Sequence, residues 1–223
     1  MRHAVVLMIF LIPILMYGPV SSASAAEFGA ALLAGYTGGP GVRLVGSVDR
    51  FAQGFPLAIE AGVGYTWLDP GSPEQARVIF INDATNGTPQ EQGWAWDLRL
   101  DFLYQVQFLG LRDAHLFAGV RYSMFTGNFN YVGGNEDFDV TSNQFGLGLG
   151  AKAVFPISTR LGLTLAAGAD YYFDATLEGH DTSYSPNGET VNGRRDYTYD
   201  TADEAINQPQ FQPVILIGLA YAF

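Results

Sequence analysis

The feature that most limits the fold of this chain is a strict alternation of large apolar residues with smaller ones. In the segment 213–223, large apolar side chains occupy Ile215, Ile217, Leu219, Tyr221 and Phe223, and the positions between them carry Val, Leu, Gly, Ala and Ala. Successive side chains of a β-strand point to opposite faces, so the segment is predicted to be a strand with a large apolar face and a tight inner face. Seven earlier segments show the same period: 28–36, 42–49, 57–67, 94–105, 115–124, 144–155 and 161–173.

The connections between these eight segments also alternate, between short and long. Three are short (51–55, 108–113 and 156–160), three are long and polar (69–92, 125–143 and 174–212), and only 37–41 is short where a long one is expected. Short turns at one rim and long loops at the other are typical of outer-membrane barrels, and an even number of strands allows an antiparallel sheet to close. The sequence therefore predicts an all-β, eight-stranded antiparallel up-and-down transmembrane β-barrel over residues 26–223, with the three long connections as external loops.

Residues 1–25 are predicted to be a cleaved signal peptide. Arg2 and His3 precede an apolar run over 5–16, and Ala23-Ser24-Ala25 supplies the small-x-small cleavage pattern. The alternative is a transmembrane anchor, but Pro13 and a run shorter than the roughly 20 residues needed to span a bilayer argue against it.

Composition limits the kinds of partner and metal site that the chain can have. The chain has no cysteine, so disulfides and thiolate metal sites are excluded, and its net charge of −11 disfavours nucleic acid and other polyanions. No cofactor is predicted.

The aromatic residues are expected to form two belts at the two membrane interfaces. With the strand directions set by the loops, the outer belt contains Tyr36, Tyr65, Trp67, Trp94, Trp96, Tyr122, Phe145, Tyr171 and Phe173, and the inner belt contains Phe28, Phe51, Phe55, Phe108, Phe155, Tyr221 and Phe223. A soluble eight-stranded barrel is the alternative, but it would carry its large residues inside and polar residues outside. Here the opposite holds, because the ions and most glycines share the face without the large residues.

The signal peptide, the architecture and the pattern Tyr221-Ala222-Phe223 resemble the eight-stranded bacterial outer-membrane barrels, which include the OmpA transmembrane domain and OmpX. The resemblance implies an outer-membrane location with both termini periplasmic, a monomer, and lipid and lipopolysaccharide as surroundings. It also implies that Tyr221 and Phe223 belong to a signal read by the barrel-assembly machinery. The chain stops at Phe223 without a peptidoglycan-binding domain, so cell-wall anchoring is not expected.

The face without the large residues carries the ions Arg43, Asp49, Glu60, Asp97, Arg99, Asp101, Arg121, Lys152 and Asp170. An eight-stranded barrel has an interior only wide enough for side chains, so these groups are expected to pair in two layers. Asp49, Glu60 and Lys152 form the inner layer, and Asp101 lies between the layers. The leading hypothesis is a salt-bridge plug in a structural or interaction protein, and the alternative is a narrow passive pore for ions or small solutes.

Few residues could support catalysis, and the protein is predicted not to be an enzyme. His115 is interpreted as a packed residue, and the His-x-Ser pair of lipid A deacylases is absent. A lipid A-modifying enzyme that uses His180 is the third hypothesis. The acidic loops suggest a cationic or divalent-ion ligand, with Ca²⁺ at Asn135–Asp139 as the specific candidate, and simple solvation of the loops is the alternative.

Overall fold

A computed structural model describes residues 26–50, 55–81, 86–108 and 111–223 of the chain, without the side chains of Phe108, Leu111 and Arg112. The signal peptide predicted over 1–25 therefore lies outside the described residues. The same holds for Phe51 and for the side chain of Phe108, both assigned to the inner aromatic belt.

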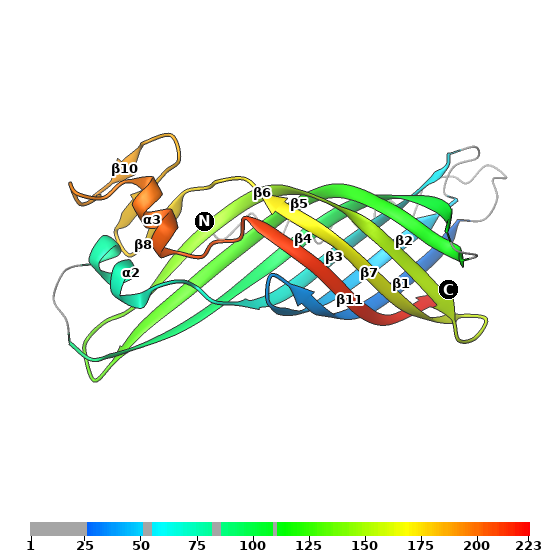
Figure 1. Ribbon diagram of the computed structural model, residues 1–223, viewed down its shortest axis with the longest axis horizontal. Coiled ribbons are helices and arrows are strands. Elements are labelled where there is room, and N and C mark those ends of the chain that lie inside the picture. Colours follow the sequence, from blue (N-terminus) through cyan, green and yellow to red (C-terminus); the bar gives the residue numbers. More distant parts are fainter. Residues whose placement is uncertain (1–25, 51–54, 82–85, 109–110) are drawn as a thin grey trace.

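Eight antiparallel strands close into a barrel, as the sequence predicts (Figure 1). Strands β1 to β7 pair with one another in sequence order, and β11 closes the ring by pairing with both β7 and β1. The barrel strands are β1 (Glu27–Thr37), β2 (Pro40–Asp49), β3 (Leu57–Leu68), β4 (Thr88–Phe108), β5 (Leu111–Val132), β6 (Asp137–Pro156), β7 (Leu161–Tyr172) and β11 (Phe211–Ala222). Closure leaves no unpaired edge within the ring, which is what a sheet surrounded by lipid requires.

The two faces of β11 have the predicted orientation. In β11, Ile215, Ile217 and Leu219 are more than half exposed on the outside, whereas Val214 and Leu216 are 2% exposed and point into the lumen. Ordinary soluble barrels bury their largest apolar residues, so an outside made of such residues is suited to contact with lipid.

The strands β5 and β6 continue far into the range 125–143, which was predicted to be a loop. Only residues 133–136 separate them, and their pairing runs from Ala114 opposite Ala153 to Asn130 opposite Asp137. The alternation persists here, but its polarity is reversed: Phe125, Phe129, Tyr131, Phe138 and Val140 point inward and are buried, with polar residues on the outside. A hairpin that rises out of the lipid is surrounded by water, so its apolar residues must turn inward.

The other two predicted loops contain regular structure as well. The range 69–92 contains helix α2 (Pro73–Phe80) and the beginning of β4. The range 174–212 contains β8 (Leu177–Gly179), β9 (Thr182–Tyr184), β10 (Thr190–Val191) and helix α3 (Tyr199–Ala205). Both helices begin at capping residues, because Ser72 accepts a hydrogen bond from the Gln75 amide and Thr198 forms a capping box with Thr201. Within the described residues, no helix combines the length and the apolar character needed to span a membrane.

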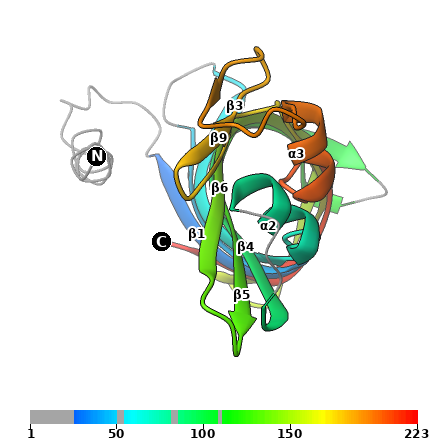
Figure 2. The same cartoon turned by 90° about the vertical axis from the view of Figure 1, so that its left-hand side faces the viewer.

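These segments assemble over one mouth of the barrel. Strand β8 pairs with the upper part of β6 and continues the sheet through β9 to β10, while α2 and α3 lie across the opening (Figure 2). We call this assembly the cap: α2, α3, β8 to β10, and residues 88–93, 125–132 and 137–143 of β4 to β6. Its core contains Ala76, Ile79, Phe80, Phe125, Phe129, Tyr131, Phe138, Val140, Leu177, Tyr184, Ala202, Ala205 and Ile206. The C-terminal end of β11 lies at the opposite end of the molecule (Figure 1).

Candidate functional site

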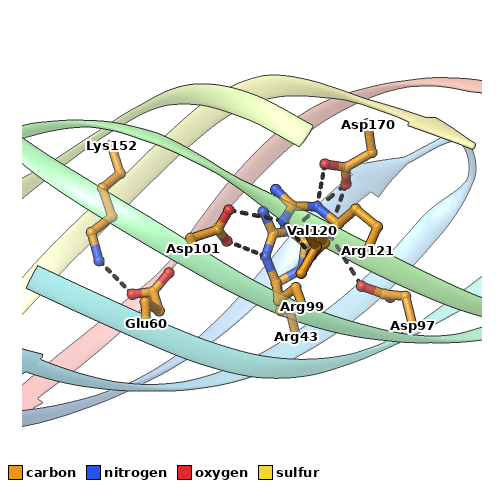
Figure 3. A network of polar contacts seen from close by, with 9 residues as sticks. All are labelled: Arg43, Glu60, Asp97, Arg99, Asp101, Val120, Arg121, Lys152 and Asp170. Carbon is orange, nitrogen blue, oxygen red and sulfur yellow. Dashed lines mark hydrogen bonds and ion pairs between the residues drawn. The ribbon is translucent and has the colours of Figure 1, made fainter. Parts of the chain in front are cut away.

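Six charged side chains from four strands meet in the middle of the lumen (Figure 3). We call them the lumen network: Arg43 from β2, Asp97, Arg99 and Asp101 from β4, Arg121 from β5, and Asp170 from β7. Each is at most 6% exposed. All six belong to the ions predicted to face inward, and Asp101, placed between two layers on sequence grounds, lies within this one.

Arg121 is the centre of the lumen network. Its Nε donates to Asp170 Oδ1 at 2.6 Å, and its Nη1 donates to Asp101 Oδ1 at 2.8 Å. Arg99 Nε donates to the second oxygen of Asp101, also at 2.8 Å. The two bonds of Arg121 link β5 to β7 and to β4, and the bond from Arg99 orients Asp101 within β4.

Arg43 is held more loosely than the other two arginines. Its Nη2 lies 3.8 Å from Asp97 Oδ1 and 3.7 Å from Asp170 Oδ2, and Arg99 Nη1 lies 3.7 Å from the same Asp170 oxygen. With three arginines against three aspartates, the lumen network carries no net formal charge. Such a balance is the condition under which buried ions are tolerated, because the removal of any one partner leaves a charge uncompensated.

Glycines on the facing strands provide the space for these side chains. A Cβ at Gly148 would collide with both Asp170 and the Arg121 guanidinium, and a Cβ at Gly64 would collide with Asp97. Gly148 belongs to the Gly146–Ala151 run, in which alternate glycines face the lumen. The absence of a side chain is the structural reason for glycine at these strand positions.

A second, smaller ion pair lies apart from the lumen network (Figure 3). Lys152 Nζ donates to Glu60 Oε2 at 2.5 Å. Asp49, predicted to share this layer, lines the same region of the wall but forms no ion pair within the described part of the chain. His115 also faces this region, with its Nδ1 3.5 Å from Asp113 Oδ1.

The lumen is open on the side of the lumen network that faces away from the cap, and it is filled on the side that faces the cap. A cavity of about 550 Å³, which we call the inner cavity, extends from the rim near Glu27 and Arg160 to Arg43 and Arg99. Toward the cap, Thr37 bonds Thr66 at 2.6 Å and Gln144 donates to the Pro209 carbonyl at 2.7 Å, and the apolar core of the cap follows. The barrel is therefore open at the end opposite the cap and closed at the cap end.

The cap has a buried ionic contact of its own. Arg77 on α2 pairs with Glu136, and its guanidinium carbon lies 4.6 Å from the centre of the Tyr131 ring. The Tyr131 hydroxyl donates to the Pro73 carbonyl at 2.7 Å, and burial raises the pKa of Tyr131. Sequence reasoning missed these residues, although the reversed alternation over 125–131 was a visible signal.

A second polar group in the cap links α3 to the segment that leads into β11. Gln208 Nε2 lies within hydrogen-bond distance of the Tyr199 hydroxyl and of Asp203 Oδ1. Burial raises the pKa of Tyr199 to about 12, with a further contribution from the negative charge of Asp203. Burial also raises the pKa of Asp203, against the opposing effect of its hydrogen bond from Gln208.

The structure gives the predicted calcium segment other partners. Glu136 pairs with Arg77, and Asp137 and Asp139 both accept hydrogen bonds from Asn128 Nδ2, at 2.9 and 2.8 Å. Among the described residues, no group of three or more His, Cys, Asp or Glu side chains is placed to hold a metal ion. These contacts give no support for Ca²⁺ at Asn135–Asp139, which stays a prediction.

His180, the residue of the lipid A hypothesis, lies at the exposed turn between β8 and β9. Its φ is +52°, and its Nδ1 lies 3.5 Å from Asp181 Oδ2. A hydrolytic triad needs the histidine within reach of a nucleophile, and the contact that His180 makes among the described residues is with the neighbouring carboxylate.

The predicted belt aromatics with described side chains lie at the outer surface of the barrel. Tyr65 contacts Trp67 and Trp96 edge to face, each with ring centres 4.9 Å apart, and Tyr221 contacts Phe223 at 5.3 Å. Phe145 and Phe223 are the most exposed, at 69% and 76%. Such amphipathic and apolar rings are suited to the two boundaries between lipid and water.

Comparison with known proteins agrees with this geometry. No protein-family model matches the chain, and no curated protein matches it in sequence. A major outer membrane protein from Thermus thermophilus is 27% identical to the chain, with a TM-score of 0.69 over 90% of this chain and 100% of that one. Two other structures also match. Acinetobacter baumannii CarO2 is 15% identical, with a TM-score of 0.44 over 90% of this chain and 100% of that one. Neisserial surface protein A is 10% identical, with a TM-score of 0.40 over 91% and 100%. In its fold and in the location that the fold implies, the chain is an eight-stranded β-barrel protein of the outer membrane.

Proposed function

We propose that the protein is a closed barrel with a structural and interaction role, not a channel. The observation that supports this is the lumen network, in which every charged group is buried and has an oppositely charged partner. A conducting pore would need a continuous file of water, and buried ions that bond one another leave none at this level.

The cap provides a second closure in series with the first. Its helices lie over the mouth (Figure 2), and buried residues of the helices and of the strands beneath them form one apolar core. Hydrogen bonds fix α2 to its surroundings, since the hydroxyl of Tyr131 at the end of β5 bonds the Pro73 carbonyl, and Arg194 Nη1, from the segment after β10, donates to the Val78 carbonyl at 2.6 Å. Passage would require both the lumen network and this core to open.

The cap is proposed to face the outside of the cell, with the termini on the periplasmic side. Outer-membrane barrels carry their long connections outside and their short turns inside, and here the short turn 157–160 lies at the end opposite the cap. The segment 174–212 displays eight carboxylates against two arginines. This acidic surface favours a cationic partner, or divalent ions that bridge it to lipopolysaccharide phosphates.

Single-channel recording of the purified protein in planar bilayers tests the closed state. We expect no unitary conductance steps above those of protein-free bilayers. Steps that change in size in Arg43→Gln but not in the exposed control Arg195→Gln would place conduction in the lumen, and the narrow passive pore would then replace the closed barrel.

Cysteine labelling tests the orientation, because the natural chain has no cysteine. Thr190→Cys lies in the cap, and Thr159→Cys lies in the turn at the opposite rim; both positions are exposed. In intact cells, a membrane-impermeant maleimide should label the first variant and spare the second. The reverse labelling would invert the proposed orientation.

A further inference from the structure

The inner cavity has the size of a ligand site. Its volume of about 550 Å³ lies within the roughly 300 to 1,000 Å³ of pockets that take small organic molecules. It opens at the rim opposite the cap and ends at the lumen network, so a ligand could enter from one side only.

The wall of the inner cavity is partly ionic and partly apolar. The ions Asp49, Glu60 and Lys152 belong to it, and Lys152 and Glu60 already neutralise each other. Its buried apolar residues, which we call the collar, include Leu33, Val45, Ala58, Leu103, Phe117 and Leu216. A side chain or ligand that filled this collar would be shielded from water on most sides.

Arginines without carboxylates form the closed end. Arg43 and Arg99 line the inner cavity, whereas Asp97, Asp101 and Asp170 do not. Both arginines are more than nine-tenths buried, and among the described residues Arg43 is held only by ion-pair contacts of 3.8 and 3.7 Å to Asp97 and Asp170. The Arg99 guanidinium also lies 5.5 Å from the centre of the Phe117 ring, so the cation stands directly above the apolar collar.

We propose that the inner cavity binds a small monocarboxylate with an apolar ring or short chain. The apolar body would occupy the collar, and the carboxylate would accept hydrogen bonds from the guanidinium groups of Arg43 and Arg99. An anion at this end of the inner cavity gains charge-assisted bonds in a site with little water. This site goes beyond the closed-barrel function and does not require the lumen to be sealed.

Fluorine NMR with 4-fluorobenzoate as the probe tests the proposal on the folded barrel in zwitterionic detergent. We expect a saturable shift of the fluorine resonance. The neutral isostere 4-fluorobenzamide should bind about tenfold more weakly or worse, because it lacks the charge that the arginines recognise. The amide also reports partition into detergent, which the two probes would share.

Cavity-filling variants locate the binding without touching an ion pair. Ala166 lines the inner cavity and is half-buried, so Ala166→Phe should weaken 4-fluorobenzoate binding at least about tenfold while the protein keeps its heat-resistant mobility on gels. Ala220→Phe, on the neighbouring strand, serves if the first variant does not fold. Arg99→Lys keeps a cation beside Asp101 but lacks the planar guanidinium with its several donors, and it should also weaken binding. Arg195→Gln, an exposed cation outside the residues that line the inner cavity, is the control that should leave the affinity unchanged.

Several outcomes would overturn the proposal. These are the absence of a saturable shift, equal binding of the acid and the amide, and full affinity in a folded Ala166→Phe or Ala220→Phe. Loss of binding in Arg195→Gln with full binding in Arg99→Lys would equally reject the site, because it would assign the interaction to a surface outside the inner cavity.

Discussion

Arg121 and Asp170 bond each other across an intervening strand, with 2.6 Å between Nε and Oδ1. Arg121 lies on β5 and Asp170 on β7, and β6 passes between them and pairs with both. The bond is possible because β6 presents Gly146 opposite Arg121 and Gly148 opposite Asp170. Two glycines thus allow a long side chain to cross a strand that would otherwise separate it from its partner.

Gly148→Ala should therefore weaken the barrel from the inside. The new methyl group would collide with Asp170 and the Arg121 guanidinium, and displacement of a buried pair costs about 3 to 5 kcal/mol of unfolding free energy. Urea unfolding in lipid vesicles measures the loss. Gly46→Ala is the matched control, because its Cβ would face lipid with only the Gly29 carbonyl nearby, at 3.9 Å. Equal midpoints for the two variants would contradict this account of Gly148.

Arg121→Met should lower the free energy of unfolding by more than the loss of side-chain volume alone would. It leaves Asp101 and Asp170 in a buried site with one cation fewer, and the expected cost is about 3 to 5 kcal/mol. The double variant Arg121→Met/Asp170→Asn restores the charge balance and should recover part of this loss. Gel mobility of unboiled samples over a temperature series reads both effects. A double variant that is less stable than the single one would argue that charge balance is not the reason.

Glu136→Gln should loosen the cap without weakening the barrel. The buried Arg77 would lose its carboxylate, at a cost of about 3 kcal/mol, which corresponds to roughly a hundredfold faster opening of α2. Hydrogen exchange followed by mass spectrometry separates the peptides of α2 from those of the barrel strands. The exposed Glu189→Gln should leave both unchanged. Faster exchange throughout the barrel in Glu136→Gln would show that the cap is not a separate unit.

The cap should also become less stable at high pH through Tyr199. Its pKa is about 12 in the folded cap against an ordinary value of 10, because burial disfavours the phenolate. The neutral form therefore contributes stability that is fully present below pH 10 and is lost as the pH rises through 12. Tyrosinate absorbance should show a late-titrating group that is missing in Tyr199→Phe. Near-ultraviolet circular dichroism should also change less in this variant between those pH values. Identical titrations of the two proteins would contradict the assignment.

Leu219→Arg tests the lipid-facing register of β11. Leu219 is half exposed on the outside, and an arginine at mid-membrane should cost about 2 to 4 kcal/mol. Phe211→Arg, on the same face near the upper end of the strand, should cost only about 0 to 1 kcal/mol, because it lies near the interface. Folded and unfolded fractions in vesicles measure both. A cost that does not depend on depth would count against this placement in the bilayer.

The sequence predicted the barrel strands because their signal is local. In Ile215, Ile217 and Leu219 the side-chain direction follows from the two-residue period of a strand, whatever lies around it. Inward ions such as Arg43, Arg121 and Asp170 could be assigned to one face by the same counting. Their partners could not, because the bond between Arg121 and Asp170 depends on the barrel's curvature and on the glycines of the strand between them.

The cap was not predicted, because what the alternation indicates depends on whether that part of the strand lies in lipid or in water. Phe125, Phe129 and Tyr131 follow the same period as Tyr122 and Met124, but on the opposite parity. A face is apolar outside where lipid surrounds the strand and apolar inside where water does, and a one-dimensional pattern does not state where the lipid ends. The sequence by itself determined the number of barrel strands, their two faces and the class of the fold. Only the tertiary structure decided which ions meet, which end is closed and where the inner cavity lies, because these depend on distances between strands remote in the chain.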